Sequence, residues 1–124
     1  MATKVQRLQR QKAYRQYLQS PDWDAKRTAK HARSFGRCSI CMTDQGPLDA
    51  HHLHYRNWVD VEMSDLRLLC RRCHDVVHLL MKEGVFRFTP EMSHHARYAR
   101  MKHHVRAYLR RQSFAPCWIR KEAI

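Results

Sequence analysis

The sequence predicts a small α+β domain, in which a two-stranded ribbon and one helix are braced by two cysteine knuckles and flanked by basic helices. Two observations favour this class: a pair of C-x-x-C motifs lies at the centre of the chain, and helical periodicity dominates on both sides of them. A chain of 124 residues fits one compact domain. Within it we distinguish basic N-terminal helices (1–36), a knuckle-braced core (37–82), and a basic C-terminal helix and tail (83–124).

Two helices are predicted before the first knuckle. Residues 4–19 place apolar side chains at roughly helical spacing. The Ser-Pro-Asp motif at 20–22 is typical of a helix start, and the helix that follows is expected to reach about Ser34, with Gly36 ending it. We interpret Trp23 as a core anchor rather than as a wedge between DNA bases. The apolar positions of the first helix are Val5, Leu8, Tyr14, Tyr17 and Leu18.

The central segment is predicted to be short and irregular apart from one strand and one helix. Residues 48–55 can form one strand of the ribbon, residues 56–64 a polar loop, and residues 64–69 the approach to the second knuckle. A helix is expected from about Arg71 to Met81, where residues four apart share a face.

A long C-terminal helix is predicted from Pro90 to about Arg111 or Gln112, because Thr89-Pro90-Glu91 repeats the capped start. The histidine pairs at 94–95 and 103–104 contain no i,i+4 spacing, so we interpret them as solvated or DNA-facing. Cys117, in the tail after Ser113, is interpreted as an ordinary apolar or surface residue.

The formal net charge of +13 is unevenly distributed. Residues 1–37 carry ten Lys or Arg against two Asp, and residues 79–124 carry ten against three Glu. Residues 38–78 carry four Arg against six acidic residues. Basic arms around a near-neutral centre favour a polyanionic partner, DNA above all, over the alternative of a solvated basic surface.

The composition also excludes some classes of protein. No apolar run approaches the roughly 20 residues that span a bilayer, and the N-terminus lacks the apolar core of a signal peptide. We therefore expect a soluble protein with no membrane partner, a monomer or homodimer, in a reducing compartment.

The four paired cysteines have the spacing of a structural zinc site. Two C-x-x-C pairs separated by 28 residues can place four thiolates around one tetrahedral ion, and such binding is coupled to folding. The alternatives are buried free thiols or a redox C-x-x-C. The predicted zinc ligands are Cys38, Cys41, Cys70 and Cys73.

Four histidines around the knuckles form a second candidate cluster. His74 and His78 are four apart on a helix, whereas the adjacent His51 and His52 point to opposite faces of a strand. Three protein ligands would leave open positions on a metal ion for water and a phosphate oxygen. A histidine with a near-neutral pKa can deprotonate that water.

These residues resemble the HNH endonuclease family. The resemblance covers about residues 14–80, and its motif is carried by the segments 51–55 and 65–78, with supporting matches at 17–23 and 37–41. It implies a ββα-metal core, metal-dependent cleavage of DNA, and a place in the cytoplasm of a bacterial or phage-infected cell. It also implies that His51, His74 and His78 bind the catalytic ion and that His52 is the general base.

The resemblance also assigns a role to Asp65 and a choice of metals. Asp65 falls at the middle Asn of the family name, a residue that braces the loop bearing the base. An ionised Asp accepts hydrogen bonds but donates none. The expected catalytic ion is Mg²⁺, Mn²⁺, Ni²⁺ or Zn²⁺, and histidine ligands favour the transition metals.

Other residues admit more than one interpretation. Asp49 and Glu62 are expected to support the site or its loops rather than to bind the metal, and His54 and Tyr55 either contact phosphate or simply end the strand. The alternative function is a zinc-ribbon nucleic-acid-binding protein without catalysis, and a third hypothesis is a component of a larger assembly. The arginines expected to contact DNA are Arg56, Arg67, Arg71, Arg72, Arg97, Arg100 and Arg106.

Overall fold

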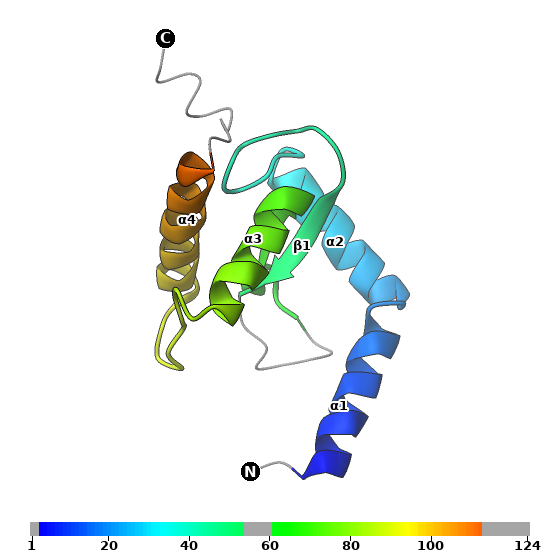
Figure 1. Cartoon of the computed structure of the whole chain (residues 1–124). Helices are drawn as coiled ribbons and strands as arrows, with labels where there is room; N and C mark the ends of the chain where they lie inside the picture. Colours follow the sequence, from blue (N-terminus) through cyan, green and yellow to red (C-terminus); the bar gives the residue numbers. More distant parts are fainter. Residues whose placement is uncertain (1–2, 54–60, 113–124) are drawn as a thin grey trace.

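The computed structural model describes residues 3–53 and 61–112 of the chain. In this part, four α-helices and a two-stranded sheet form a small α+β fold, which confirms the predicted class (Figure 1). The elements follow in the order α1 (Lys4–Tyr17), α2 (Pro21–Arg33), β1 (Leu48–His52), the 3-10 turn η1 (Met63–Asp65), β2 (Leu66–Cys70), α3 (Arg71–Lys82) and α4 (His94–Arg111).

The sheet joins both knuckles to the central helix. β1 and β2 are antiparallel, with Leu48 opposite Cys70 and His51 opposite Arg67. α3 begins directly after β2, and the Sγ atom of Cys70 caps it by accepting a hydrogen bond from the Cys73 backbone N–H at 3.4 Å. The second knuckle is therefore the junction between a strand and a helix. The knuckle and helix predicted from about residue 71 lie where expected.

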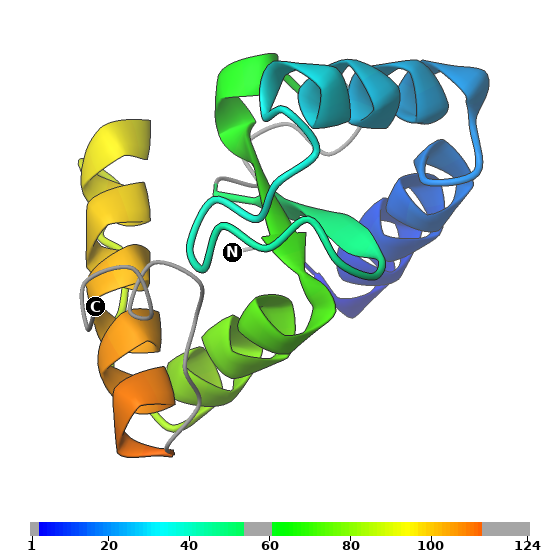
Figure 2. The same ribbon diagram turned by 90° about the horizontal axis from the view of Figure 1, so that it is seen from above.

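The N-terminal helices meet at a corner (Figure 2). The Ser20 side chain caps α2 by accepting from the Trp23 backbone N–H at 3.2 Å, as its Ser-Pro-Asp start predicts. α1 ends at Tyr17, two residues before the predicted end, because the Ser20 hydroxyl binds the Tyr17 carbonyl at 2.6 Å and closes a turn there. α1 extends from this corner away from the body.

The predicted start of the last helix at Pro90 is wrong, since α4 begins at His94. The Ser93 hydroxyl caps it by accepting from the Ala96 backbone N–H at 3.1 Å. Residues 89–92 form a turn instead, and the Arg97 guanidinium binds the carbonyls of Thr89 and Met92. Those two carbonyls are thus held outside the helical ladder by a side chain from one turn further along.

The main core surrounds the four cysteines. α4 packs along α3 and buries Met101, Val105 and Leu109 against the knuckles. A second, smaller cluster joins the N-terminal helices to the sheet, and Trp23 lies in it at 7% exposure, which confirms the interpretation of this residue as a core anchor. The members of the second cluster are Tyr17, Trp23, Val61 and Leu66.

None of the helices in the described ranges combines the length and the apolar character that crossing a membrane requires.

Candidate functional site

The four knuckle cysteines converge into one buried cluster. One sulfur atom from each lies within 4.8 Å of the others, and none of these side chains forms a disulfide. Cys38, Cys41 and Cys73 are fully buried, and Cys70 is 6% exposed. Four buried thiols this close together can hold a metal ion such as zinc. The predicted pairing of the two motifs into one site is therefore confirmed as a geometric fact.

The local backbone favours a thiolate at Cys38. The backbone N–H groups of Ile40 and Cys41 point at the Cys38 sulfur, at 3.4 and 3.5 Å. Hydrogen bonds from Cys41 and the other two thiols lower the pKa of Cys38, although burial acts in the opposite direction. The deprotonated form is the one that binds metal, so this side chain is prepared for that role.

Helix α4 seals the first knuckle with two polar contacts. The Tyr98 hydroxyl donates to the Ser39 carbonyl at 2.5 Å, and the Arg106 guanidinium donates twice to the Ile40 carbonyl, at 2.9 and 3.1 Å. Arg106 was expected to contact DNA, and in the structure its guanidinium is bound to the knuckle backbone instead. The sequence gives no signal for the contact between Arg106 and the Ile40 carbonyl, because the two residues are 66 positions apart.

A second cluster contains three histidines from two elements. His51 comes from β1, and His74 and His78 come from α3, and one ring nitrogen of each lies within 4.8 Å of the others. The Nε2 atoms of His74 and His78 are 3.0 Å apart. The i,i+4 spacing on α3 thus brings His74 and His78 together, as the sequence predicts. The position of β1 in the sheet places the ring of His51 beside them.

Asp49 determines the orientation of His74. Its carboxylate lies 3.1 Å from His74 Nδ1, and because a carboxylate only accepts, Nδ1 carries the proton and Nε2 keeps its lone pair. Arg71 donates to the same carboxylate at 2.9 Å. Burial raises the pKa of Asp49, but the hydrogen bonds from Arg71 and His74 outweigh it and the pKa is lowered. Arg71, expected to bind DNA, is paired here.

His51 is held neutral. It is 3% exposed, and burial, followed by the nearby charges of His74 and His78, lowers its pKa to about 3. Its Nδ1 atom is buried and has no hydrogen-bond partner among the described residues. A neutral imidazole is the form that binds a metal ion, and an unsatisfied buried nitrogen beside two other ring nitrogens fits a metal ligand.

His52 lies on the opposite face of β1, against the N-terminal helices. Its ring stacks on Trp23 with 5.2 Å between centroids, and its Nδ1 is 3.4 Å from the Tyr14 hydroxyl. Burial lowers the pKa of His52, the Asp65 carboxylate raises it, and His74 lowers it further. The result is an imidazole that is neutral at pH 7 and fixed in orientation by two aromatic neighbours.

Two surface cavities adjoin the histidines. One, of about 490 Å³, lies between the N-terminal helices and the sheet, and Tyr14, Trp23 and Arg71 line it together with all four histidines. The other, of about 650 Å³, lies towards the end of α3, and its lining includes His51, His52 and His78. A ligand in either cavity therefore reaches the cluster directly.

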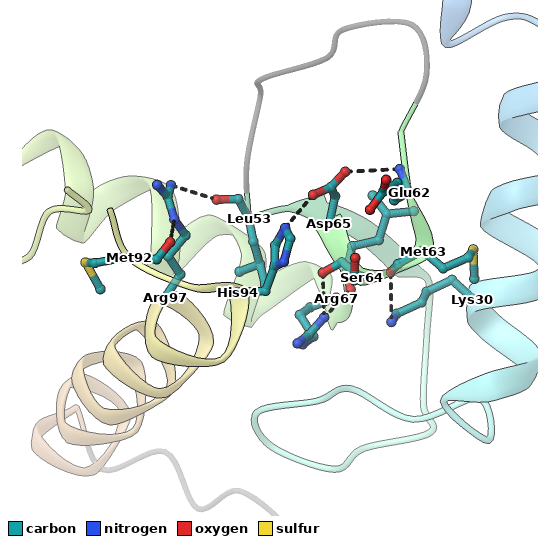
Figure 3. Close-up of polar contacts among 11 residues, drawn as sticks. Lys30, Leu53, Glu62, Met63, Ser64, Asp65, Arg67, Met92, His94 and Arg97 are labelled. Carbon is teal, nitrogen blue, oxygen red and sulfur yellow. Dashed lines mark hydrogen bonds and ion pairs between the residues drawn. The ribbon is translucent and has the colours of Figure 1, made fainter. Parts of the chain in front are cut away.

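Asp65 is buried beside Leu53, the residue that follows His52 (Figure 3). Its carboxylate accepts from the Glu62 backbone N–H at 3.0 Å and pairs with His94 Nε2 at 2.5 Å. Its backbone carbonyl accepts from the Leu53 N–H at 2.7 Å. The contact to the chain just after His52 is thus made by the main chain of residue 65, while the side chain is held by the start of α4.

Helix α4 supplies two contacts that the sequence did not predict. His94, expected to be solvated or DNA-facing, is partly buried against Asp65. Arg97 is 7% exposed, and its guanidinium binds three backbone carbonyls, those of Leu53, Thr89 and Met92 (Figure 3). Burial and these bonds contradict the expectation that Arg97 contacts DNA, and they assign it to holding α4 against the end of β1.

The other arginines that were expected to contact DNA lie in different environments. Arg67 donates to the carbonyls of Ser64 and Leu66, and Arg100 donates to the Arg87 carbonyl. Arg72 is exposed on the first turn of α3. Glu62 is exposed and takes part in the turn before β2. Arg56, His54 and Tyr55 lie outside the described residues, and so does Cys117.

Comparison of the chain with models of protein families, with curated proteins and with solved structures gives no match in any of the three.

Proposed function

We propose that this protein is a metal-dependent DNA endonuclease of the HNH type. The observation that carries the proposal is the three-histidine cluster of His51, His74 and His78, open to two cavities and separate from the sealed cysteine cluster. A structural metal site closes its ligand shell, whereas a catalytic site keeps positions open. Among residues 3–53 and 61–112, the four cysteines suit the closed kind of site and the three histidines suit the open kind.

The three imidazoles suit a divalent ion. Each offers one ring nitrogen to a common point, and the Asp49–His74 contact is the carboxylate–histidine arrangement that orients metal-binding imidazoles. A divalent ion bound there would polarise the scissile phosphate and stabilise the charge on the departing 3′-oxygen. Nitrogen ligands favour Mn²⁺, Ni²⁺ or Zn²⁺, and Mg²⁺ fits them less well.

His52 is the proposed general base. When its Nδ1 donates to the Tyr14 hydroxyl, Nε2 carries the lone pair that takes a proton from water. The resulting hydroxide attacks phosphorus, and the bond from phosphorus to the 3′-oxygen breaks. Asp65 and His94 would support this step by fixing the chain after His52, in the place where the resembled family uses Asn.

Cleavage of supercoiled plasmid with Mn²⁺ tests the proposal. Wild type should nick the plasmid, His78→Ala should lose metal and activity together, and His52→Ala should bind metal normally but cut roughly 10²- to 10⁴-fold more slowly. His103→Ala, an exposed residue on α4, is the matched control and should cut at the wild-type rate. A wild type that binds the plasmid and leaves it intact would instead support a non-catalytic zinc-ribbon protein.

A further inference from the structure

We infer that α1 is the arm that docks duplex DNA, and that one of its faces leads the phosphate backbone into the cavity between the N-terminal helices and the sheet. This inference rests on the proposed function, because it names the surface by which the substrate reaches the histidine cluster. The sequence predicts basic arms on both sides of the core, but it singles out individual arginines only in the core and on the C-terminal helix.

α1 is a basic helix whose first ten residues project from the body of the protein. Residues 4–13 are all exposed, and the helix carries five cations and no acidic residue. Within the described ranges, none of the five cations forms a hydrogen bond or an ion pair with another residue. These charges therefore keep their full capacity for an external polyanion. They are Lys4, Arg7, Arg10, Lys12 and Arg15.

One face of α1 points along the helix to His52. Arg7, Arg10 and Tyr14 are spaced by three and four residues, so they lie in one row. Tyr14 ends that row, and its hydroxyl lies 3.4 Å from His52 Nδ1. Tyr14 also lines the smaller cavity together with the whole histidine cluster. A backbone bound along the row is thereby directed to the proposed base and metal ligands.

Helix α4 is less suited to this task, although it is equally basic. The guanidinium groups of Arg97, Arg100 and Arg106 are bonded to backbone carbonyls of the protein. The helix also packs in the main core, on the side of the molecule opposite α1 (Figure 1). Three of its five arginines are thus bonded within the protein, whereas α1 presents an extended row of unengaged charge next to the cavity.

Charge and length favour duplex DNA as the occupant. Each residue of a helix rises about 1.5 Å, so the row from Arg7 to Tyr14 spans about 10 Å. Duplex DNA presents one negative charge per roughly 1.7 Å of its axis, which provides several phosphates over that length. A straight row of cations on a rigid helix matches this regular array of phosphates.

The test compares two double variants on opposite sides of α1. Arg7→Gln/Arg10→Gln removes two charges from the Tyr14 row, and Lys12→Gln/Arg15→Gln removes two from the other side. Binding of a labelled DNA duplex is measured by fluorescence anisotropy between 50 and 300 mM NaCl without added divalent ion, so that binding is read independently of cleavage. Circular dichroism melting verifies that both variants fold.

The row variant should weaken binding roughly 30-fold at 0.15 M salt and reduce the slope of log Kd against log salt by about 1.8, because each lost phosphate contact contributes about 0.9. The opposite-side variant should weaken binding by less than about 10-fold at the same salt concentration. Equal effects of the two variants, or none, would overturn the assignment of the row. Tighter binding of an RNA duplex than of DNA would overturn the choice of DNA.

Cleavage of bis(p-nitrophenyl) phosphate separates this inference from the proposed function. That small diester needs no docking arm, so the row variant should hydrolyse it at the wild-type rate if both proposals hold. If wild type cleaves neither substrate but the row variant still loses DNA binding, the nuclease proposal fails and the docking surface stands.

Discussion

At the scale of single residues, the centre of this protein depends on which histidines are kept neutral and how they are oriented. His51 is neutral because it is buried beside two other imidazoles, and His74 is oriented because Asp49 accepts from its Nδ1. His52 is held by an aromatic stack and a tyrosine hydroxyl. Each ring therefore has a different physical cause for its state, and each cause can be removed separately.

The lowered pKa of His51 makes stability depend on pH. Its pKa falls from 6.5 in an unfolded chain to about 3 in the fold, so at intermediate pH only the unfolded chain binds this proton. The stabilisation is complete above pH 6.5 and is lost with falling pH at up to about 1.4 kcal/mol per unit. Urea denaturation from pH 7 to 5 measures the slope of the free energy of unfolding against pH, and this slope should be shallower for His51→Gln than for wild type. His103→Gln should keep the full slope, and parallel slopes for wild type and His51→Gln would contradict the prediction.

Loss of Asp49 should weaken metal binding. Asp49→Ala removes the acceptor of His74 Nδ1–H, and loss of such a supporting carboxylate typically lowers metal affinity by about 10- to 100-fold. Asp49→Asn should fall between, since the amide oxygen still accepts. Titration with Mn²⁺ or Co²⁺ measures the effect. Asp44→Ala, an exposed carboxylate away from the cluster, should bind like wild type.

At the scale of elements, α4 holds the parts of the core together. It contacts the first knuckle through Tyr98 and Arg106, and the end of β1 through Arg97. His94 adds a contact to Asp65. The helix thereby ties together the cysteine cluster and the segment that carries the proposed base.

Replacing Arg97 should destabilise the fold strongly. Arg97→Ala removes the guanidinium donor from three backbone carbonyls, of which that of Thr89 keeps the Met92 N–H. It also removes a cation from the face of Phe88. We expect a loss of about 2–4 kcal/mol in the free energy of unfolding. Arg100→Ala removes one exposed hydrogen bond and should stay within about 0.5 kcal/mol of wild type. Chemical denaturation of both variants shows whether the loss of stability comes from the buried hydrogen bonds of Arg97 or from the loss of a positive charge on α4.

At the scale of the whole molecule, the cysteine cluster is the centre of the main core. Residues of both knuckles, α3 and α4 pack around it, so the hydrophobic core and the candidate zinc site are the same region. The histidine cluster lies at the surface of this unit and shares α3 with it. Fold stability and the proposed chemistry therefore draw on neighbouring residues of one helix.

Zinc removal should unfold the protein cooperatively. Without an ion, the buried thiols lose their bonding partner, and α4 loses the knuckle against which it packs. A strong chelator, or Cys41→Ser, should abolish the cooperative thermal transition seen by circular dichroism. Cys117→Ser is the matched control and should melt like wild type. Retention of the transition in Cys41→Ser would show that packing alone stabilises the core.

Much of the fold and of the candidate site could be predicted, because the signals involved are local. Ser20 caps α2 and the i,i+4 histidines converge on α3, since both depend on neighbours a few residues away. The convergence of the two knuckles could be predicted because a pair of C-x-x-C motifs is typical of one four-thiolate site. The start of α4 was missed because Arg97 holds the preceding carbonyls, a contact whose other partner, Leu53, lies 44 residues away.

The arginines show the same limit more clearly. A basic helix has one pattern whether its guanidinium groups face solvent or the carbonyls of the protein. Arg97 and Arg106 bind carbonyls of the protein, whereas Arg7 and Arg10 on α1 face solvent. Only the placement of the helices relative to the core distinguishes the two.

The alternation of β1 has a consequence for how the chain tolerates insertions and deletions. His51 faces α3 and His52 faces the N-terminal helices because successive strand residues point to opposite sides. Deleting Ala50 would preserve every histidine and yet shift the pairing frame by one position, which exchanges the two faces. The protein should therefore accept many substitutions in this strand more readily than a change of a single residue in its length.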